Sequence, residues 1–173
     1  KILGAKVFGK PEEMARLTKA IGSITEAVKA EIDKWRETLA PNDIAVMEAV
    51  NLMEAGYARW CDVMWLVGVD DDIAHKRLVE TRGMAETEAN QRLASMRPYD
   101  QRRPGADWGY LNNTTREDLQ AAVEVELDRV YALHKAGELP ASVFLPWWTE
   151  LLEKNRANLE ASGVKLPPKG ETA

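Results

Sequence analysis

The pattern of apolar and polar positions predicts two buried strands near the middle of the chain. Ile44–Glu48 is apolar and ends on an acid, whereas Val63–Val69 (VMWLVGV) is apolar on both faces. A strand of the second kind is typical of a parallel sheet that helices cover. Ligands of such sheets bind beyond the carboxyl ends of the strands, where Glu48 and Asp70–Asp72 stand in this sequence.

The remaining pattern is mostly helical. Pro11 opens a stripe of apolar residues that recur every three or four positions as far as Leu39, and Gly22-Ser23 interrupts it. Two helices are predicted over Asp71 to about Thr81 and over Ala85–Met96, and a third, short strand at Trp108–Leu111. A long helix should follow from the cap at Asn112–Thr115 to about Lys135, and another should begin at Pro146. The inward face of the long helix is predicted to consist of Leu119, Val123, Leu127, Val130 and Leu133. This order of strands and helices predicts a helix-rich α/β fold.

Beyond the last long helix, the chain reads as an appendage. Residues 137–173 would add one helix and a Pro- and Lys-rich tail from Lys165 that we expect to be disordered. Trp147 and Trp148 stand outside the apparent core, so they predict docking of this helix either onto the domain or onto a protein partner.

Composition narrows the class of protein. The 173 residues suffice for about one domain, and the net charge of -5 does not indicate a nucleic-acid partner. The single cysteine, Cys61, offers no disulfide framework and fits a reducing, cytoplasmic compartment. No apolar run approaches the roughly 20 residues of a membrane span, and no secretory signal is visible.

One stretch imitates a phosphate-binding loop. Gly4–Lys10 matches G-x-x-x-x-G-K, but only three residues precede it where a buried strand is needed. Pro11 stands where that motif has its magnesium-binding Ser or Thr. We therefore interpret this match as a chance occurrence.

A basic cluster is the more informative feature. Arginines around a helix and its adjoining loop can grip phosphate oxygens in pairs and offset the charge that develops in phosphoryl transfer. The alternative is a solvated, salt-bridged surface. The cluster comprises Arg92, Arg97, Arg102 and Arg103, with Lys76 and Arg77 on the preceding helix.

Two polar residues at predicted strand ends are further candidates. Glu48 could act as a general base or hold magnesium through water, or it could be an ion-paired or capping carboxylate. Asn112 could hydrogen-bond an adenine edge, or it could be a turn residue. His75, His134 and Cys61 carry no pattern of a catalytic site and are interpreted as packing or surface residues.

Four stretches taken together resemble dephospho-coenzyme A kinase, in particular the form fused in the bifunctional coenzyme A synthase. They are LGAKVFGKPEEMARLT, MEAVNLMEAG, WLVGVDDDIAHKRLVETRGMAETEANQRLASMRP and ADWGYLNNTTREDL. The resemblance is ordered from about Leu3 to Val130 and covers the carboxyl two-thirds of the family pattern. It implies a P-loop kinase fold over residues 1–136, with a parallel-sheet core, a helical substrate region at Glu12–Leu39 and a lid at about 76–107.

The resemblance also implies a function. The family transfers the terminal phosphate of ATP, with Mg²⁺, to the ribose 3'-hydroxyl of dephospho-coenzyme A. Arg92 falls on the lid arginine, Arg103 on the basic position that follows, Asn112 on the asparagine near the adenine, and Glu54 on the glutamate of an LLFE-like segment.

Departures from the family pattern leave a second reading open. The amino-terminal P-loop unit is lacking in this chain, and Gly22-Ser23, Thr81, Met96 and Leu111 replace polar residues of the pattern. The first reading is an active kinase, although these 173 residues alone are expected not to turn over ATP because the phosphate cradle is absent. The second is a catalytically inactive kinase-fold subunit with a structural or protein-binding role.

Overall fold

The computed structural model describes residue 6 and residues 10–161, and the chain forms two compact units. The first unit is residues 1–49 and the second is residues 50–173. Most of Gly4–Lys10 and the predicted tail from Lys165 lie outside the described residues. No helix in the described part of the chain is both long and apolar enough to cross a membrane.

The first unit is a pair of helices, α2 (Pro11–Ile21) and α3 (Ile24–Thr38). Gly22 adopts a positive φ of 77°, which side-chain-bearing residues rarely do, and Ser23 then caps α3 by accepting a hydrogen bond from the backbone N–H of Glu26 at 3.1 Å. The predicted break at Gly22-Ser23 is confirmed.

The predicted strand at Ile44–Glu48 is wrong. These residues form neither helix nor strand, and the side chain of Val46 is 79% exposed. A strand needs a neighbour to satisfy its backbone N–H and C=O groups, and among the described residues the only strand pairing is the one in the second unit. An apolar composition without such a neighbour does not produce a strand.

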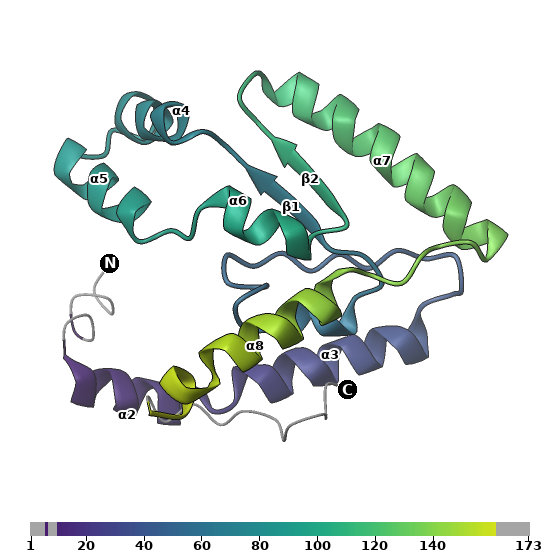
Figure 1. The fold of residues 1–173 in the computed structure, drawn as a ribbon, viewed down its shortest axis with the longest axis horizontal. Helices are drawn as coiled ribbons and strands as arrows, with labels where there is room; N and C mark the ends of the chain where they lie inside the picture. Colours follow the sequence, from purple (N-terminus) through teal and green to yellow (C-terminus); the bar gives the residue numbers. More distant parts are fainter. Residues whose placement is uncertain (1–5, 7–9, 162–173) are drawn as a thin grey trace. The chain divides into compact units, whose positions relative to one another are not determined.

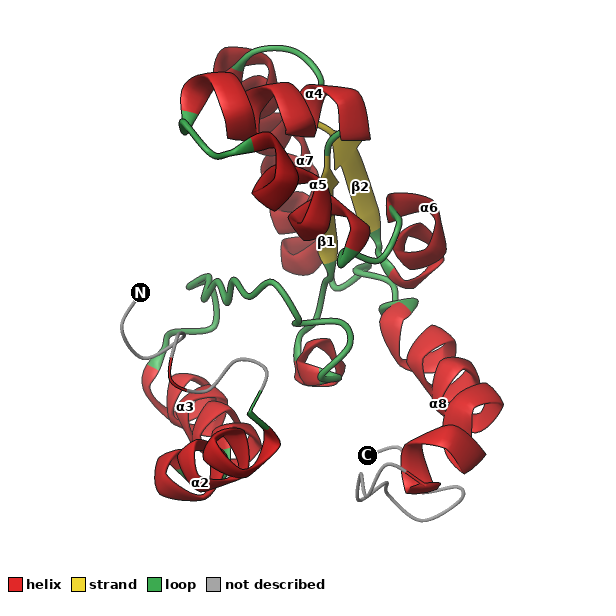
Figure 2. Ribbon diagram, turned by 90° about the vertical axis from the view of Figure 1, so that its left-hand side faces the viewer, coloured by secondary structure: helices red, strands yellow, loops and turns green. Residues whose placement is uncertain are grey.

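The second unit contains a two-stranded parallel sheet of β1 (Trp65–Gly68) and β2 (Trp108–Leu111). Trp65 pairs with Trp108 and Gly68 with Leu111, and Figures 1 and 2 both show the two strands side by side. The strand predicted at Val63–Val69 is therefore present but shorter. It is also covered less completely than predicted, because Leu66 is buried while Val67 is 48% exposed.

Helical segments connect the two parallel strands, as a parallel connection requires. The predicted helices on either side of Gly83 are both present, and Figure 1 shows α4 following the carboxyl end of β1. The segments are α4 (Asp71–Lys76), η2 (Arg77–Thr81), α5 (Glu86–Ala94), α6 (Tyr99–Arg102) and η3 (Arg103–Gly105).

The long helix α7 (Arg116–Ala136) follows β2 and ends close to the predicted Lys135, where Gly137, with a φ of 71°, forms its cap. Its predicted inward face is partly wrong, because Leu127 is exposed. The one buried residue of α7 is Glu126, whose carboxylate accepts two hydrogen bonds from the Arg129 guanidinium at 2.6 and 2.8 Å. An ion-paired acid therefore lies where the apolar stripe predicted the core.

The last described helix, α8 (Phe144–Ala161), packs on η3 and on η1 (Tyr57–Trp60). Phe144 and Trp148 are buried, so Trp148 belongs to the core rather than outside it. Its ring occupies the space that a side chain at Gly56 would need, and the Trp147 ring does the same at Gly105. Of the two predicted docking modes, the structure shows α8 docked within its own unit.

Candidate functional site

At the carboxyl end of the sheet, hydrogen bonds of Asn112 and Asn113 hold the chain after β2 against the chain after β1. The backbone N–H of Asn112 donates to the Gly68 carbonyl at 2.8 Å, which continues the pairing one residue beyond β2. Asn113 and Asp70 then exchange two hydrogen bonds, of 2.8 and 2.9 Å. Asp70 stands at the N-cap position of α4, but its side chain makes no capping bond and instead fixes the loop after β2.

Asn112 lies at this end of the sheet, half-buried. Its side-chain oxygen is buried and has no hydrogen-bond partner among the described residues. The Arg77 guanidinium holds the backbone around it by donating to the carbonyls of Asn112 at 2.7 Å and Thr114 at 2.9 Å. The orientation of Asn112 is thus set through its backbone, while its amide oxygen is left unpaired.

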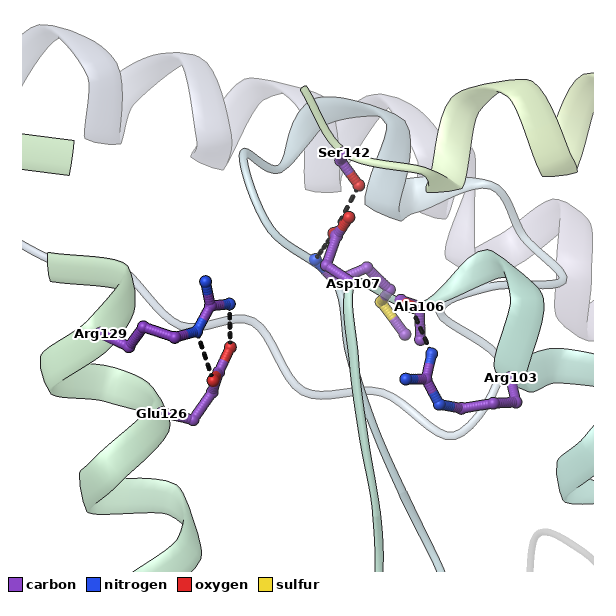
Figure 3. A network of polar contacts seen from close by, with 7 residues as sticks. Arg103, Ala106, Asp107, Glu126, Arg129 and Ser142 are labelled. Carbon is purple, nitrogen blue, oxygen red and sulfur yellow. Dashed lines mark hydrogen bonds and ion pairs between the residues drawn. The ribbon is translucent and has the colours of Figure 1, made fainter. Parts of the chain in front are cut away.

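The end of the predicted lid lies over the sheet because two glycines leave room for it. The Tyr99 ring occupies the space that a side chain at Gly68 would need, and the Arg103 stem does so at Gly109. The Arg103 guanidinium donates to the carbonyl of Ala106 at 2.7 Å (Figure 3). This arginine is therefore close to the sheet, with one of its donors already used by the backbone.

A pocket of about 200 Å³ opens between the segment before η1 and the carboxyl end of α5. It is lined by Val50, Asn51, Glu54, Ser95, Met96, Arg97 and Arg102. The Arg97 Nε lies 3.9 Å from a Glu54 carboxylate oxygen, and both side chains are partly exposed. The predicted substrate residue Glu54 therefore shares this pocket with two members of the basic cluster.

The other predicted site residues are not in this pocket. Arg92 is exposed on the last turn of α5, and its side chain has no partner among the described residues. Glu48 is exposed at the end of the first unit, in a stretch without helix or strand. The structure thus brings together Glu54, Arg97 and Arg102, with Asn112 and Arg103 at the sheet.

Asp107 is a polar residue that sequence reasoning missed. Its carboxylate accepts a hydrogen bond from the Ser142 hydroxyl at 2.6 Å (Figure 3). It also accepts hydrogen bonds from the Met64 N–H at 2.6 Å and the Val143 N–H at 2.8 Å. Its position directly before the predicted strand at Trp108 was the only signal available. Asp107 joins the starts of β1, β2 and α8.

The described residues do not supply a protein-built magnesium site. No three His, Cys, Asp or Glu side chains gather closely enough within that part of the chain to hold a metal ion. Magnesium usually binds through one or two carboxylates together with waters and substrate phosphates.

Comparison with known proteins identifies the family. The sequence model for "Dephospho-CoA kinase" matches residues 1–118. The chain is 31% identical to the dephospho-CoA kinase of Streptococcus mutans over 129 residues. The matched region covers 74% of this chain and 64% of that protein. It is 33% identical over 135 residues to the dephospho-CoA kinase of Geobacillus kaustophilus, a match that covers 77% of this chain and 66% of that protein. It is 37% identical over 122 residues to the dephospho-CoA kinase of Corynebacterium glutamicum, a match that covers 69% of this chain and 59% of that protein.

These relatives are longer than the matched region, and the chain spans a little under two thirds of their length. No solved structure matches the chain significantly. The helix-rich architecture with a small parallel sheet agrees with the P-loop kinase-like α/β fold that the resemblance implied. The chain belongs to the dephospho-CoA kinase family.

Proposed function

We propose that the protein phosphorylates the 3'-hydroxyl of dephospho-CoA, with ATP as the phosphoryl donor, in coenzyme A biosynthesis. The observation that carries this proposal is the family match across residues 1–118, which includes the whole lid segment. Its support from geometry is that Arg97 and Arg102, at the end of that segment, face Glu54 across one pocket. ATP would arrive with Mg²⁺ on its phosphates, and the cytoplasm is the compartment that the lone Cys61 suggests.

The proposed roles follow from charge and position. Arg92 and Arg103 would bind phosphate oxygens, because guanidinium groups bind them in pairs and offset developing charge. Asn112, whose amide oxygen is unpaired, would contact the adenine. Glu54 would contact dephospho-CoA, and Glu48 would serve as the general base. Residues 1–136 would form the kinase-like domain, with the lid at about 76–107 and residues 137–173 as the appendage.

The test measures coenzyme A formed from dephospho-CoA and ATP by the natural gene product that contains these residues. Arg92→Met should lower kcat about 100-fold, because it removes a charge that stabilises the transition state. The matched control is Arg82→Met, since Arg82 is an exposed arginine of the same segment.

Three outcomes would contradict parts of this proposal. Absence of turnover by the natural gene product, with dephospho-CoA still bound, would support the inactive kinase-fold subunit instead. Equal effects of Arg92→Met and Arg82→Met would remove Arg92 from the site. Turnover by these 173 residues alone would contradict the expectation that they lack the phosphate cradle.

A further inference from the structure

The pocket around Glu54 contains an unusual concentration of unpaired polar atoms. Among the described residues, four buried side-chain N or O atoms have no hydrogen-bond partner. Two of them, the Glu54 Oε2 and the Arg102 Nε, belong to residues that line this one pocket. An unpaired buried polar group is unfavourable, because it gives up its hydrogen bonds to water without replacing them. The wall of the pocket therefore holds one acceptor and one donor that a bound molecule could satisfy once the two side chains turn toward it.

The charges of the pocket favour an anion. Arg97 and Arg102 contribute two positive charges against the single negative charge of Glu54. The separation of 3.9 Å between Arg97 and Glu54 is too long for a hydrogen bond, so the ion pair does not saturate the Arg97 guanidinium. Two arginines on one pocket can bind a phosphate group in the paired geometry that guanidinium groups prefer.

Glu54 restricts the kind of phosphate that fits. An ionised carboxylate only accepts hydrogen bonds, so its free oxygen needs a donor from the ligand. A hydroxyl close to the phosphate would supply that donor and keep the phosphate itself on the arginines. A volume of about 200 Å³ also limits the ligand to a phosphate and a few further non-hydrogen atoms.

We propose that the pocket formed by Glu54, Arg97 and Arg102 binds a phosphate ester that carries a hydroxyl next to its phosphate. The two arginines bind the phosphate, and Glu54 accepts the hydrogen bond of the hydroxyl. Small rotations of the Glu54 and Arg102 side chains, which are only partly buried, expose the two unpaired atoms to the ligand. The inference deepens the proposed function and rests on it for the choice of a phosphate ester over other anions.

The experiment is a calorimetric titration of the 173-residue chain without ATP. The probe is sn-glycerol 3-phosphate, which carries both groups, and the matched ligands are n-propyl phosphate, which lacks the hydroxyls, and glycerol, which lacks the phosphate. We expect glycerol 3-phosphate to bind at one site, several-fold more tightly than propyl phosphate, and glycerol not to bind. Saturable binding of glycerol alone, or no saturable binding of glycerol 3-phosphate, would overturn the proposal.

Variants assign the binding to the pocket. Arg97→Met and Arg102→Lys should each weaken glycerol 3-phosphate binding about tenfold or more, because each loses a charge-assisted hydrogen bond. Arg82→Met, which changes an exposed arginine outside the pocket, should change it less than twofold. Similar losses in Arg97→Met and Arg82→Met would show non-specific attraction to positive charge and overturn the assignment.

Glu54→Gln separates the role of the carboxylate from that of the arginines. Loss of its negative charge should leave propyl phosphate binding unchanged or tighter, while the preference for glycerol 3-phosphate falls to about equality. A preference that survives in Glu54→Gln would overturn the role of Glu54. Because no ATP is present, this result is independent of whether the natural gene product forms coenzyme A.

Discussion

At the scale of single residues, Asp107 has the largest predicted effect on stability. Its two oxygens accept three hydrogen bonds, from Met64 and from the adjacent Ser142 and Val143, so one side chain fixes two distant segments of the chain. Asp107→Asn keeps the size but replaces one acceptor oxygen by an N–H₂ group that faces donors. Urea unfolding should show a loss of about 1.5–3 kcal/mol, the usual range for a hydrogen bond to a charged group.

The control for this change is Asp128→Asn. Asp128 is exposed on α7 and has no partner among the described residues, so its replacement should stay within about 0.5 kcal/mol. Equal stability of the two variants would show that the Asp107 hydrogen bonds make no net contribution to the free energy of unfolding.

Only part of the candidate site could be predicted from the residues themselves. The basic cluster was visible as a composition, but the sequence could not indicate that Arg97 and Arg102 face Glu54 while Arg92 stays exposed. Which arginine reaches an acid more than 40 positions away depends on where the intervening chain folds. The position of Asp107 before a predicted strand could not indicate its role, because its donors lie 35 to 43 positions away.

At the scale of elements, the start of α7 offers a pH-dependent test. Thr115 accepts a hydrogen bond from the Asp118 N–H at 3.1 Å, and the Asp118 carboxylate accepts from the Thr115 hydroxyl at 2.8 Å and from the Thr115 N–H at 3.2 Å. Thr115→Ala removes this capping box and should lower the free energy of unfolding by about 1 kcal/mol at pH 7. Thermal or urea unfolding measures the difference.

The same contacts set how this effect depends on pH. Hydrogen bonds from the Thr115 side chain, followed by those from Thr114 and the Thr115 backbone, lower the pKa of Asp118 below its ordinary value of 3.8. A carboxylate with a lowered pKa in the folded state contributes stability above the ordinary value and loses it as the pH falls through the folded-state pKa. The gap between the wild type and Thr115→Ala should therefore shrink below about pH 4, whereas a constant gap down to pH 2 would contradict the role of Asp118.

The elements that sequence reasoning identified correctly are those with local signals. The break at Gly22, the end of α7 at Gly137 and the cap at Thr115 each depend on a conformation or hydrogen bond within a few residues. The strand predicted at Ile44–Glu48 is absent because a strand depends on a partner elsewhere in the chain. The predicted inward face of α7 is partly wrong for a related reason, since the buried Glu126 is explained by its ion pair with Arg129 rather than by apolar periodicity.

At the scale of the whole molecule, the parallel order of β1 and β2 agrees with the predicted parallel sheet. The kinase-like domain expected over residues 1–136 stays a prediction, and the compact units of the structure divide between Ala49 and Val50. Within the second unit, α8 packs on η1 and η3, so the helix that reads as an appendage in the sequence shares that unit's core. Contacts between residues distant in sequence, rather than composition, decide where a unit ends.

This division predicts where a protease will first cut within residues 10–161. Residues 43–49 form neither helix nor strand and expose apolar side chains, among them Ile44 and Val46, which thermolysin prefers. Local exposure and the lack of backbone pairing make such a segment open at low free energy. Brief digestion under native conditions should therefore give a fragment that starts between Ile44 and Val50 and contains β1, β2, α7 and α8, as mass spectrometry would show. A first cut within residues 86–102 would contradict the prediction, because it would mean that the arginine-bearing segment around the pocket opens more easily than the connection between the two units.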